Sequence, residues 1–264
     1  MTTSRLPLGR GARLILLGSF AAIVFAVIHA FPRIPQDVRY HGFADCRAML
    51  GVPNFNDVVS NAPFVLVGIV GLRALRKNGG ARVRNGSERT AWGVAFLGVL
   101  LTGFGSAYYH LRPINETLGW DRLPMTVCFC ALTAAQIAEC VGPVAGKRIL
   151  LPLLGFGAGS VVYWSMTERA GDGDLRWYGY VQFFPILFVP ALWRFFPRNY
   201  DRTSDFVFAG LWYAAAKVLE ASDRAVFHLT NGGLAGHGLK HLAAAAATAC
   251  LVRHVLRRRP LASA

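Results

Sequence analysis

The sequence predicts an all-α protein, a polytopic transmembrane helical bundle with a seven-helix core and one extra N-terminal transmembrane helix. Three observations support this prediction. Hydrophobic residues make up 54% of the chain and charged residues only 16%, a balance typical of membrane proteins. The apolar residues occur in blocks of about 20 residues, the length that crosses a bilayer as a helix. The stretches between the blocks are too short to form a separate soluble domain.

Eight apolar blocks are expected to form the transmembrane helices. The first follows Arg5, Arg10 and Arg13, and no A-x-A-like cleavage site clearly ends it. We therefore interpret residues 1–35 as a retained N-terminal helix rather than a signal peptide, and residues 36–264 as the seven-helix domain. The blocks cover about residues 13–31, 58–76, 91–110, 122–141, 148–167, 177–196, 204–220 and 236–256.

The net charge of +14 is distributed as membrane topology requires. Lys and Arg gather at the N-terminus, in the loop with Arg76 and Lys77, near 147–148, near 194–202 and in the tail at 257–259. Most acidic residues lie in the intervening loops. The positive-inside rule then places both termini in the cytoplasm. The Ala-, Gly- and Arg-rich composition favours a bacterial inner membrane, and no motif indicates nucleic-acid binding.

The cysteines do not form a disulfide framework in this interpretation. Four of the five lie inside apolar blocks, where packing is their expected role. Only Cys46 lies in a loop, without an obvious loop partner.

Three histidines lie at block ends on the same, non-cytoplasmic side. His110 closes the third block, while His237 and His241 open the last, and their i,i+4 spacing places both on one helix face. Histidine is costly in lipid unless it faces a cavity or a metal. Three nitrogen ligands with an open fourth position are the protein part of a catalytic zinc site. The sequence therefore predicts such a site, although an interfacial histidine is the simpler alternative for His237.

Two further polar residues lie close to this predicted site. Ser106 is one turn before His110 on the same helix face, although a small hydroxyl also serves helix packing. Asp121 precedes Arg122-Leu123-Pro124, so it is predicted either to cap its helix or to act at the mouth of a cavity, two compatible roles.

Two further acids and three further histidines lie near the ends of the blocks or in the loops between them. Glu220 and Asp223 share a helix face, and they either line the same cavity or pair with Lys217 or Arg224. His228 and His254 are expected to be loop or interface residues, and His29 a helix-end residue.

Taken together, these motifs resemble the alkaline ceramidase family. This family belongs to a group of seven-helix membrane hydrolases that also includes the adiponectin/progestin-type receptors. The resemblance rests on Ser106-x-x-x-His110, on Asp121 eleven residues later, and on His237-x-x-x-His241. The segment NFNDVVSN at 54–61 also resembles the start of the family's first core helix. The similarity extends from about Tyr40 to the last helix.

The resemblance implies a bacterial-type, zinc-dependent amidase that cuts the N-acyl bond of ceramide or a similar lipid, releasing a sphingoid base and a fatty acid. It implies that His110, His237 and His241 bind zinc. It also implies that Ser106 helps stabilise the oxyanion and that Asp121 positions or deprotonates water. The headgroup, the acyl length and the oligomeric state do not follow from it.

One feature of the family is not reproduced. The eukaryotic enzymes bind calcium through an acid-rich segment before the first core helix, whereas this chain has few acids there and a cation, Arg47. Because calcium prefers six to eight oxygen ligands, we expect no calcium site or a weak one. Arg47 would instead pair with Asp45 or Asp57. The partial ligand set is Asp45, Asn54, Asn56 and Asp57.

Other classes of function are less well supported. A receptor or sensor with a structural zinc site would need neither Ser106 nor Asp121. A metal or proton transporter would need polar residues continuing towards the cytoplasm, and the sequence has no such series and no internal repeat. A hydrolase of another acylated lipid remains the nearest alternative.

Overall fold

The structure, a computed structural model, describes residues 8–76 and 80–261. Within these ranges every regular element is helical, which confirms the predicted all-α class, and the β-structure there is limited to two isolated bridges. Arg5 and Lys77, which contributed to the predicted topology, lie outside the described residues. The elements are α1 (Arg10–Ala30), η1 (Val38–His41), α2 (Phe55–Val59), α3 (Ala62–Ala74), α4 (Gly86–Leu111), α5 (Asn115–Cys140), α6 (Pro143–Arg169), α7 (Arg176–Phe195), α8 (Ser204–Ala221), α9 (Asp223–Leu229) and α10 (Gly236–Arg257).

Seven of the eight predicted apolar blocks each coincide with one helix, and the block at about 58–76 falls on the end of α2 and on α3. The helices α1, α4, α5 and α6, and the run of α2 and α3, are long and apolar enough to cross a membrane. The chain therefore has the character of a membrane protein. The helices α7, α8 and α10 contain 20, 18 and 22 residues. Within the described residues, however, they do not combine the high mean hydropathy and the low number of charged residues of the other five spans. That these three also cross the bilayer stays a prediction.

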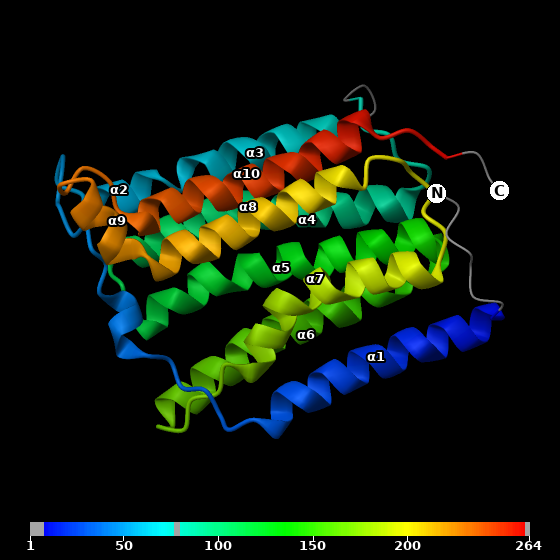
Figure 1. The fold of residues 1–264 in the computed structure, drawn as a ribbon, viewed down its shortest axis with the longest axis horizontal. Coiled ribbons are helices and arrows are strands. Elements are labelled where there is room, and N and C mark those ends of the chain that lie inside the picture. The colour runs from blue at the N-terminus through cyan, green and yellow to red at the C-terminus, as the bar shows by residue number, and fades with distance from the viewer. Residues whose placement is uncertain (1–7, 77–79, 262–264) are drawn as a thin grey trace.

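The two central helices are α4 and α5, which pack against each other more extensively than any other pair in the described ranges. Figure 1 shows α3, α8 and α10 together on one side of this pair, and α6 and α7 on the other. Side chains from α4, α5 and α10 form the largest buried cluster, which includes Trp92, Phe96, Ala131 and Val255. The bundle is thus built around an α4–α5 core.

The first helix lies at the edge of the bundle (Figure 1). α1 packs mainly against α7, where Leu17 joins a buried cluster with Phe188 and Leu192. Most of its other residues are exposed although they are apolar, as expected for a helix that faces lipid. This position fits its interpretation as an addition to the core.

A glycine permits the close approach of α4 and α5 near the predicted site. A Cβ at Gly105 would collide with the carbonyl oxygen of Trp120, so a larger residue would force the two helices apart. Ser106 and Asp121 are the residues that follow these two. The contact between Gly105 and Trp120 therefore sets the spacing between Ser106 and Asp121.

The prediction for His254 was wrong. Instead of lying in a loop or at an interface, its side chain is 3% exposed in the last turn of α10 and packs between Trp92 and Phe206. Since α10 continues to Arg257, His254 belongs to the helix, and its turn is packed inside the bundle. Arg258, which follows, is fully buried, and it contacts Glu139 and lies 3.5 Å from Glu88 (Nη2 to Oε2).

Candidate metal centre

Three buried histidines form a compact cluster at one end of the bundle. His110 comes from the last turn of α4, while His237 and His241 come from the first turns of α10. Their ring centroids lie 4.9 Å and 5.0 Å apart, and one nitrogen from each lies within 4.8 Å of the others. Each residue is at most 4% exposed. The structure thus brings together all three histidines singled out in the sequence.

Neighbouring polar groups hold the helix ends that carry these histidines. The Asp223 carboxylate accepts a hydrogen bond from the backbone N–H of His237 at 2.7 Å, at the beginning of α10. A Cβ at Gly236 would lie 2.8 Å from the Cα of Asp223, so only glycine allows α10 to begin this close to α9. The Asn54 side-chain amide donates to the carbonyl oxygen of His110 at 2.8 Å. These contacts position the imidazoles before any ligand binds.

The hydrogen bonds around the three rings leave nitrogen atoms available to a metal. His110 Nδ1 and His237 Nε2 are buried and have no hydrogen-bond partner among residues 8–76 and 80–261. His241 Nδ1 lies 2.7 Å from Ser60 Oγ, and this hydroxyl donates to the carbonyl oxygen of Asp57 at 3.0 Å. His241 Nδ1 must then be the donor to Ser60, which leaves Nε2 with a free lone pair. Buried imidazoles with free lone pairs fit a transition-metal ion.

Ser106 and Asp121 lie beside the histidine cluster. Both side chains are buried, they lie close enough to interact, and both line the same pocket as His241. The alternative in which Asp121 caps its helix is wrong, because α5 begins at Asn115 rather than near residue 122. The capping contact at the start of α5 is made by Thr117, whose hydroxyl accepts a hydrogen bond from the backbone N–H of Ile114 at 3.3 Å. Asp121 lies further along, inside the helix.

Three of the four side chains considered for calcium form hydrogen bonds with other residues. The Asp45 carboxylate accepts hydrogen bonds from Arg47 at 2.6 and 2.7 Å and from the Asn56 amide at 2.8 Å, so the predicted pairing with Arg47 is confirmed. This guanidinium lowers the pKa of Asp45 to about 2. Asn54 binds the end of α4, as described above. Asp57 is fully buried in α2, and its carboxylate oxygens have no hydrogen-bond partner in the described parts of the chain.

The two alternatives for Glu220 both apply. Its carboxylate accepts hydrogen bonds from Lys240 Nζ at 2.7 Å, from Lys217 Nζ, and from the Tyr40 hydroxyl at 3.2 Å. Glu220 also lines the pocket. Asp223, in contrast, binds backbone N–H groups of His237 and Ala44 and does not line the pocket. The pairing partner Lys240 was not predicted, although a lysine inside an apolar block is a visible signal.

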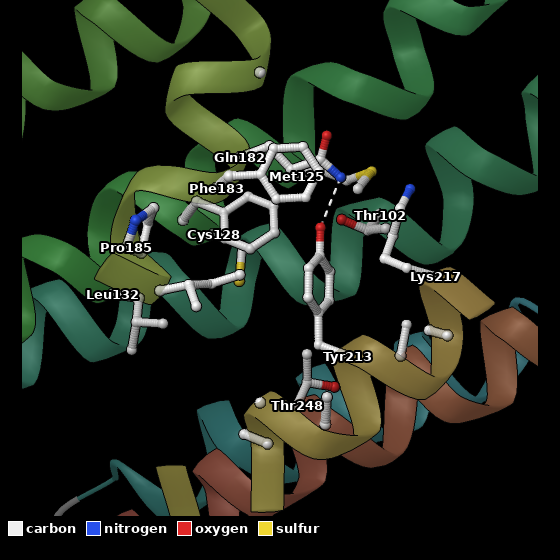
Figure 2. A pocket seen from close by; sticks show the side chains of 18 of the residues that line it. Thr102, Met125, Cys128, Leu132, Gln182, Phe183, Pro185, Tyr213, Lys217 and Thr248 are labelled. Carbon is white, nitrogen blue, oxygen red and sulfur yellow. Dashed lines mark hydrogen bonds between the residues drawn. The ribbon is translucent and has the colours of Figure 1, made fainter. Parts of the chain in front are cut away.

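A large apolar pocket adjoins the metal centre. It has a volume of about 740 Å³ and is lined by residues of α4, α5, α7, α8 and α10. On α10 the lining runs from Lys240 to Leu251, roughly 16 Å along a helix, or about half of the hydrocarbon thickness of a bilayer. Figure 2 shows Tyr213 of α8 reaching across this space to Gln182 of α7, to which it is hydrogen-bonded at 2.7 Å. Because α7 packs on α5 and α8 packs on α10, the pocket separates α7 from α8.

Two residues close to the histidines were not predicted to belong to the site. Phe43, in the loop before α2, packs its ring 4.7 Å from His110 and 4.3 Å from His237 (centroid distances). Ser60 orients His241, as described above. Both belong to segments far from α10 in sequence, so only the folded chain places them beside it.

Compared with protein-family models and with curated protein sequences, the chain matches none at a significant level.

Proposed function

We propose that this chain is a zinc-dependent membrane amidohydrolase that cleaves the N-acyl amide bond of ceramide or a ceramide-like lipid. The products would be a sphingoid base and a fatty acid. The observation that carries the proposal is the placement of three buried histidines, Ser106 and Asp121 at one end of a large apolar pocket. A purely structural metal site needs neither the serine nor the aspartate. The choice of amide bond and of ceramide rests on the motif resemblance to alkaline ceramidases.

The metal would be held by His110, His237 and His241. Zinc bound in this way supplies a Lewis acid that polarises a carbonyl and lowers the pKa of water towards 7. Ser60 supports this role because its hydrogen bond fixes the orientation and proton of the His241 ring. Phe43 packs over two of the rings and helps to exclude bulk water.

Asp121 and Ser106 would carry the proton transfer and the charge stabilisation. The Asp121 carboxylate accepts a proton from the attacking water and returns it to the nitrogen of the leaving amine, so that the C–N bond breaks and water adds across it. The Ser106 hydroxyl donates a hydrogen bond to the oxygen on which negative charge develops. One such donor contributes on the order of 3 kcal/mol to transition-state stabilisation in other enzymes.

The pocket would bind the acyl chain of the substrate. Its lining is mostly apolar, and along α10 it extends from Lys240, next to His241, to Leu251. Since α7 and α8 are separated by this pocket, a lipid would enter laterally between them from the bilayer. This route suits a substrate that does not leave the membrane.

The proposal includes an orientation in a bacterial inner membrane, with both termini cytoplasmic. The support is the distribution of charge. The end of the bundle opposite the histidines carries the ends of α7 and α10 with their basic residues, such as Arg198 and Arg257. The positive-inside rule assigns that end to the cytoplasm and the metal centre to the periplasmic side.

The proposal is tested by measuring zinc content and N-acyl lipid hydrolysis of the purified protein and of His237→Ala. We expect about one zinc per chain and hydrolysis for the unaltered protein, and loss of both in the variant. His228→Ala is the matched control, because His228 is an exposed histidine of α9. Normal hydrolysis by His237→Ala would refute the site. Bound zinc without hydrolysis of any N-acyl lipid would favour a receptor or sensor.

A further inference from the structure

The charged side chains that line the pocket are not balanced. Four are cationic and two are anionic, namely Arg122, Arg176, Lys217 and Lys240 against Asp121 and Glu220. Arg176 is paired outside this set with Asp174, at 2.7 and 2.8 Å. Both lysines share the single carboxylate of Glu220. A pocket for an entirely neutral lipid does not need this surplus of positive charge.

Among the four pocket-lining cations, Arg122 is the one that forms no ion pair with an acid in residues 8–76 and 80–261. Its side chain is stacked between the rings of Trp164 and Tyr178, with the guanidinium carbon 4.2 and 4.7 Å from their centroids. One guanidinium nitrogen, Nη2, donates to Gln36 Oε1 at 2.5 Å. The other, Nη1, is buried and has no hydrogen-bond partner in the described part of the chain.

An unpaired guanidinium in such surroundings is unfavourable by itself. Arg122 is 6% exposed, so it has lost most of its hydration, and no carboxylate of the described residues forms a direct ion pair with it. The two aromatic rings compensate in part through cation–π contacts. They also fix the plane of the guanidinium, which favours binding of a planar anion such as a carboxylate.

We propose that the preferred substrate is acidic, an N-acyl lipid that bears a carboxylate within a few bonds of the scissile amide. Arg122 binds this carboxylate, and the excess charge of Lys217 and Lys240 attracts it into the pocket. Arg122 follows Asp121 in α5, and the two side chains lie within electrostatic reach of each other. An anion at Arg122 is therefore next to the proposed reacting centre. This inference rests on the proposed amide hydrolysis, and it replaces neutral ceramide by an acidic N-acyl lipid as the preferred substrate.

The test uses two substrates that differ in a single group. N-palmitoylserine and N-palmitoylserinol share the acyl chain and the amide, but the first carries a carboxylate where the second carries a hydroxymethyl group. We expect kcat/KM to be at least about tenfold higher for the acid, the range expected of a charged hydrogen bond. In Arg122→Gln the ratio of the two kcat/KM values should fall about tenfold, towards one.

The matched control is Arg176→Gln, which alters a pocket-lining arginine that already has its own carboxylate. A variant that only loosens the fold changes both substrates in proportion, so the ratio should stay as in the unaltered protein. Equal rates for the two substrates in the unaltered protein would overturn the inference. A ratio that persists in Arg122→Gln would overturn it as well.

A binding measurement separates this inference from the proposed function. The two lipids are titrated in detergent micelles against Asp121→Asn, with tryptophan fluorescence as the readout, because Trp164 contacts Arg122. We expect at least about tenfold tighter binding of the acid, and loss of that preference when Arg122→Gln is added. Preferential binding without hydrolysis by the unaltered protein would refute the hydrolase and leave the acidic ligand standing. Hydrolysis by the unaltered protein together with equal binding of the two lipids would refute the acidic ligand and leave the hydrolase standing.

Discussion

Ser60 Oγ lies 2.7 Å from Nδ1 of His241, and this hydrogen bond connects the end of α2 to the first turns of α10. A partner on the second ring nitrogen fixes the tautomer of a metal-binding histidine and raises its basicity. The contact therefore makes Ser60 a positioning residue for the proposed metal centre.

Removing this hydroxyl should weaken metal binding without abolishing it. We expect Ser60→Ala to lower the zinc affinity by about 10-fold or more, because such supporting contacts typically contribute 10- to 100-fold. Competition with a zinc chelator measures the change. Ser60→Thr keeps the hydroxyl and should retain most of the affinity; an equal loss in both variants would indicate a packing effect instead.

Asp121→Asn should separate chemistry from metal binding. The amide is close in size to the carboxylate but is a poor general base, so kcat should fall by about 10²- to 10⁴-fold. The zinc content should remain that of the unaltered protein, because the three histidines are unchanged. Retained activity would show that another group accepts the proton.

A larger side chain at Thr248 should shorten the acyl chain that the pocket accepts. Thr248 lines the pocket on α10 (Figure 2), about 10 Å along the helix from His241. Thr248→Phe should reduce hydrolysis of palmitoyl substrates more than of octanoyl substrates, measured as the ratio of kcat/KM. Thr248→Val is the control of similar volume. An unchanged ratio for Thr248→Phe would place the acyl chain elsewhere.

The Asp45–Arg47 pair should give a pH-dependent contribution to stability. The pKa of Asp45 is lowered from 3.8 to about 2 by Arg47. A lowered pKa in the folded state stabilises the fold above pH 3.8, and the stabilisation is lost as the pH falls from about 4 to 2. Arg47→Gln should therefore melt below the unaltered protein at pH 6, and the difference should shrink towards pH 2.

The control for this experiment is Arg39→Gln. Arg39 pairs with Asp37 on the surface, where an ion pair contributes little to stability. Its melting temperature should change less at every pH. A difference for Arg47→Gln that persists unchanged down to pH 2 would contradict the assignment.

At the opposite end of the bundle, Arg258 should be important for stability rather than for catalysis. Its buried guanidinium forms ion pairs with Glu139 and Glu88, so Arg258→Met leaves two buried acids without their cation. Breaking such a buried ion pair costs about 3–5 kcal/mol. We expect a clear drop in melting temperature, with unchanged zinc content in the protein that stays folded. A melting temperature equal to that of the unaltered protein would contradict this view.

Local patterns allowed much of the fold to be predicted. The apolar blocks anticipated the helices because helix formation in a membrane depends on continuous apolar length. The beginning of α5 was missed, since residues 115–121 include four polar or charged side chains and the helix extends beyond the apolar block. His254 was missed because the sequence does not show which helix ends turn inward.

Spacing along single chain segments was enough to predict most of the helices, the shared face of His237 and His241, and the residue types that a hydrolytic site needs. The topology predicted that His110 lies on the same side as this pair, but the packing of the folded chain was needed to show that the three rings meet, that Ser60 orients His241, and that Arg122 lines the pocket without an ion pair to residues 8–76 and 80–261. Such contacts depend on how distant helices pack. The spacing of residues within each helix carries no information about them.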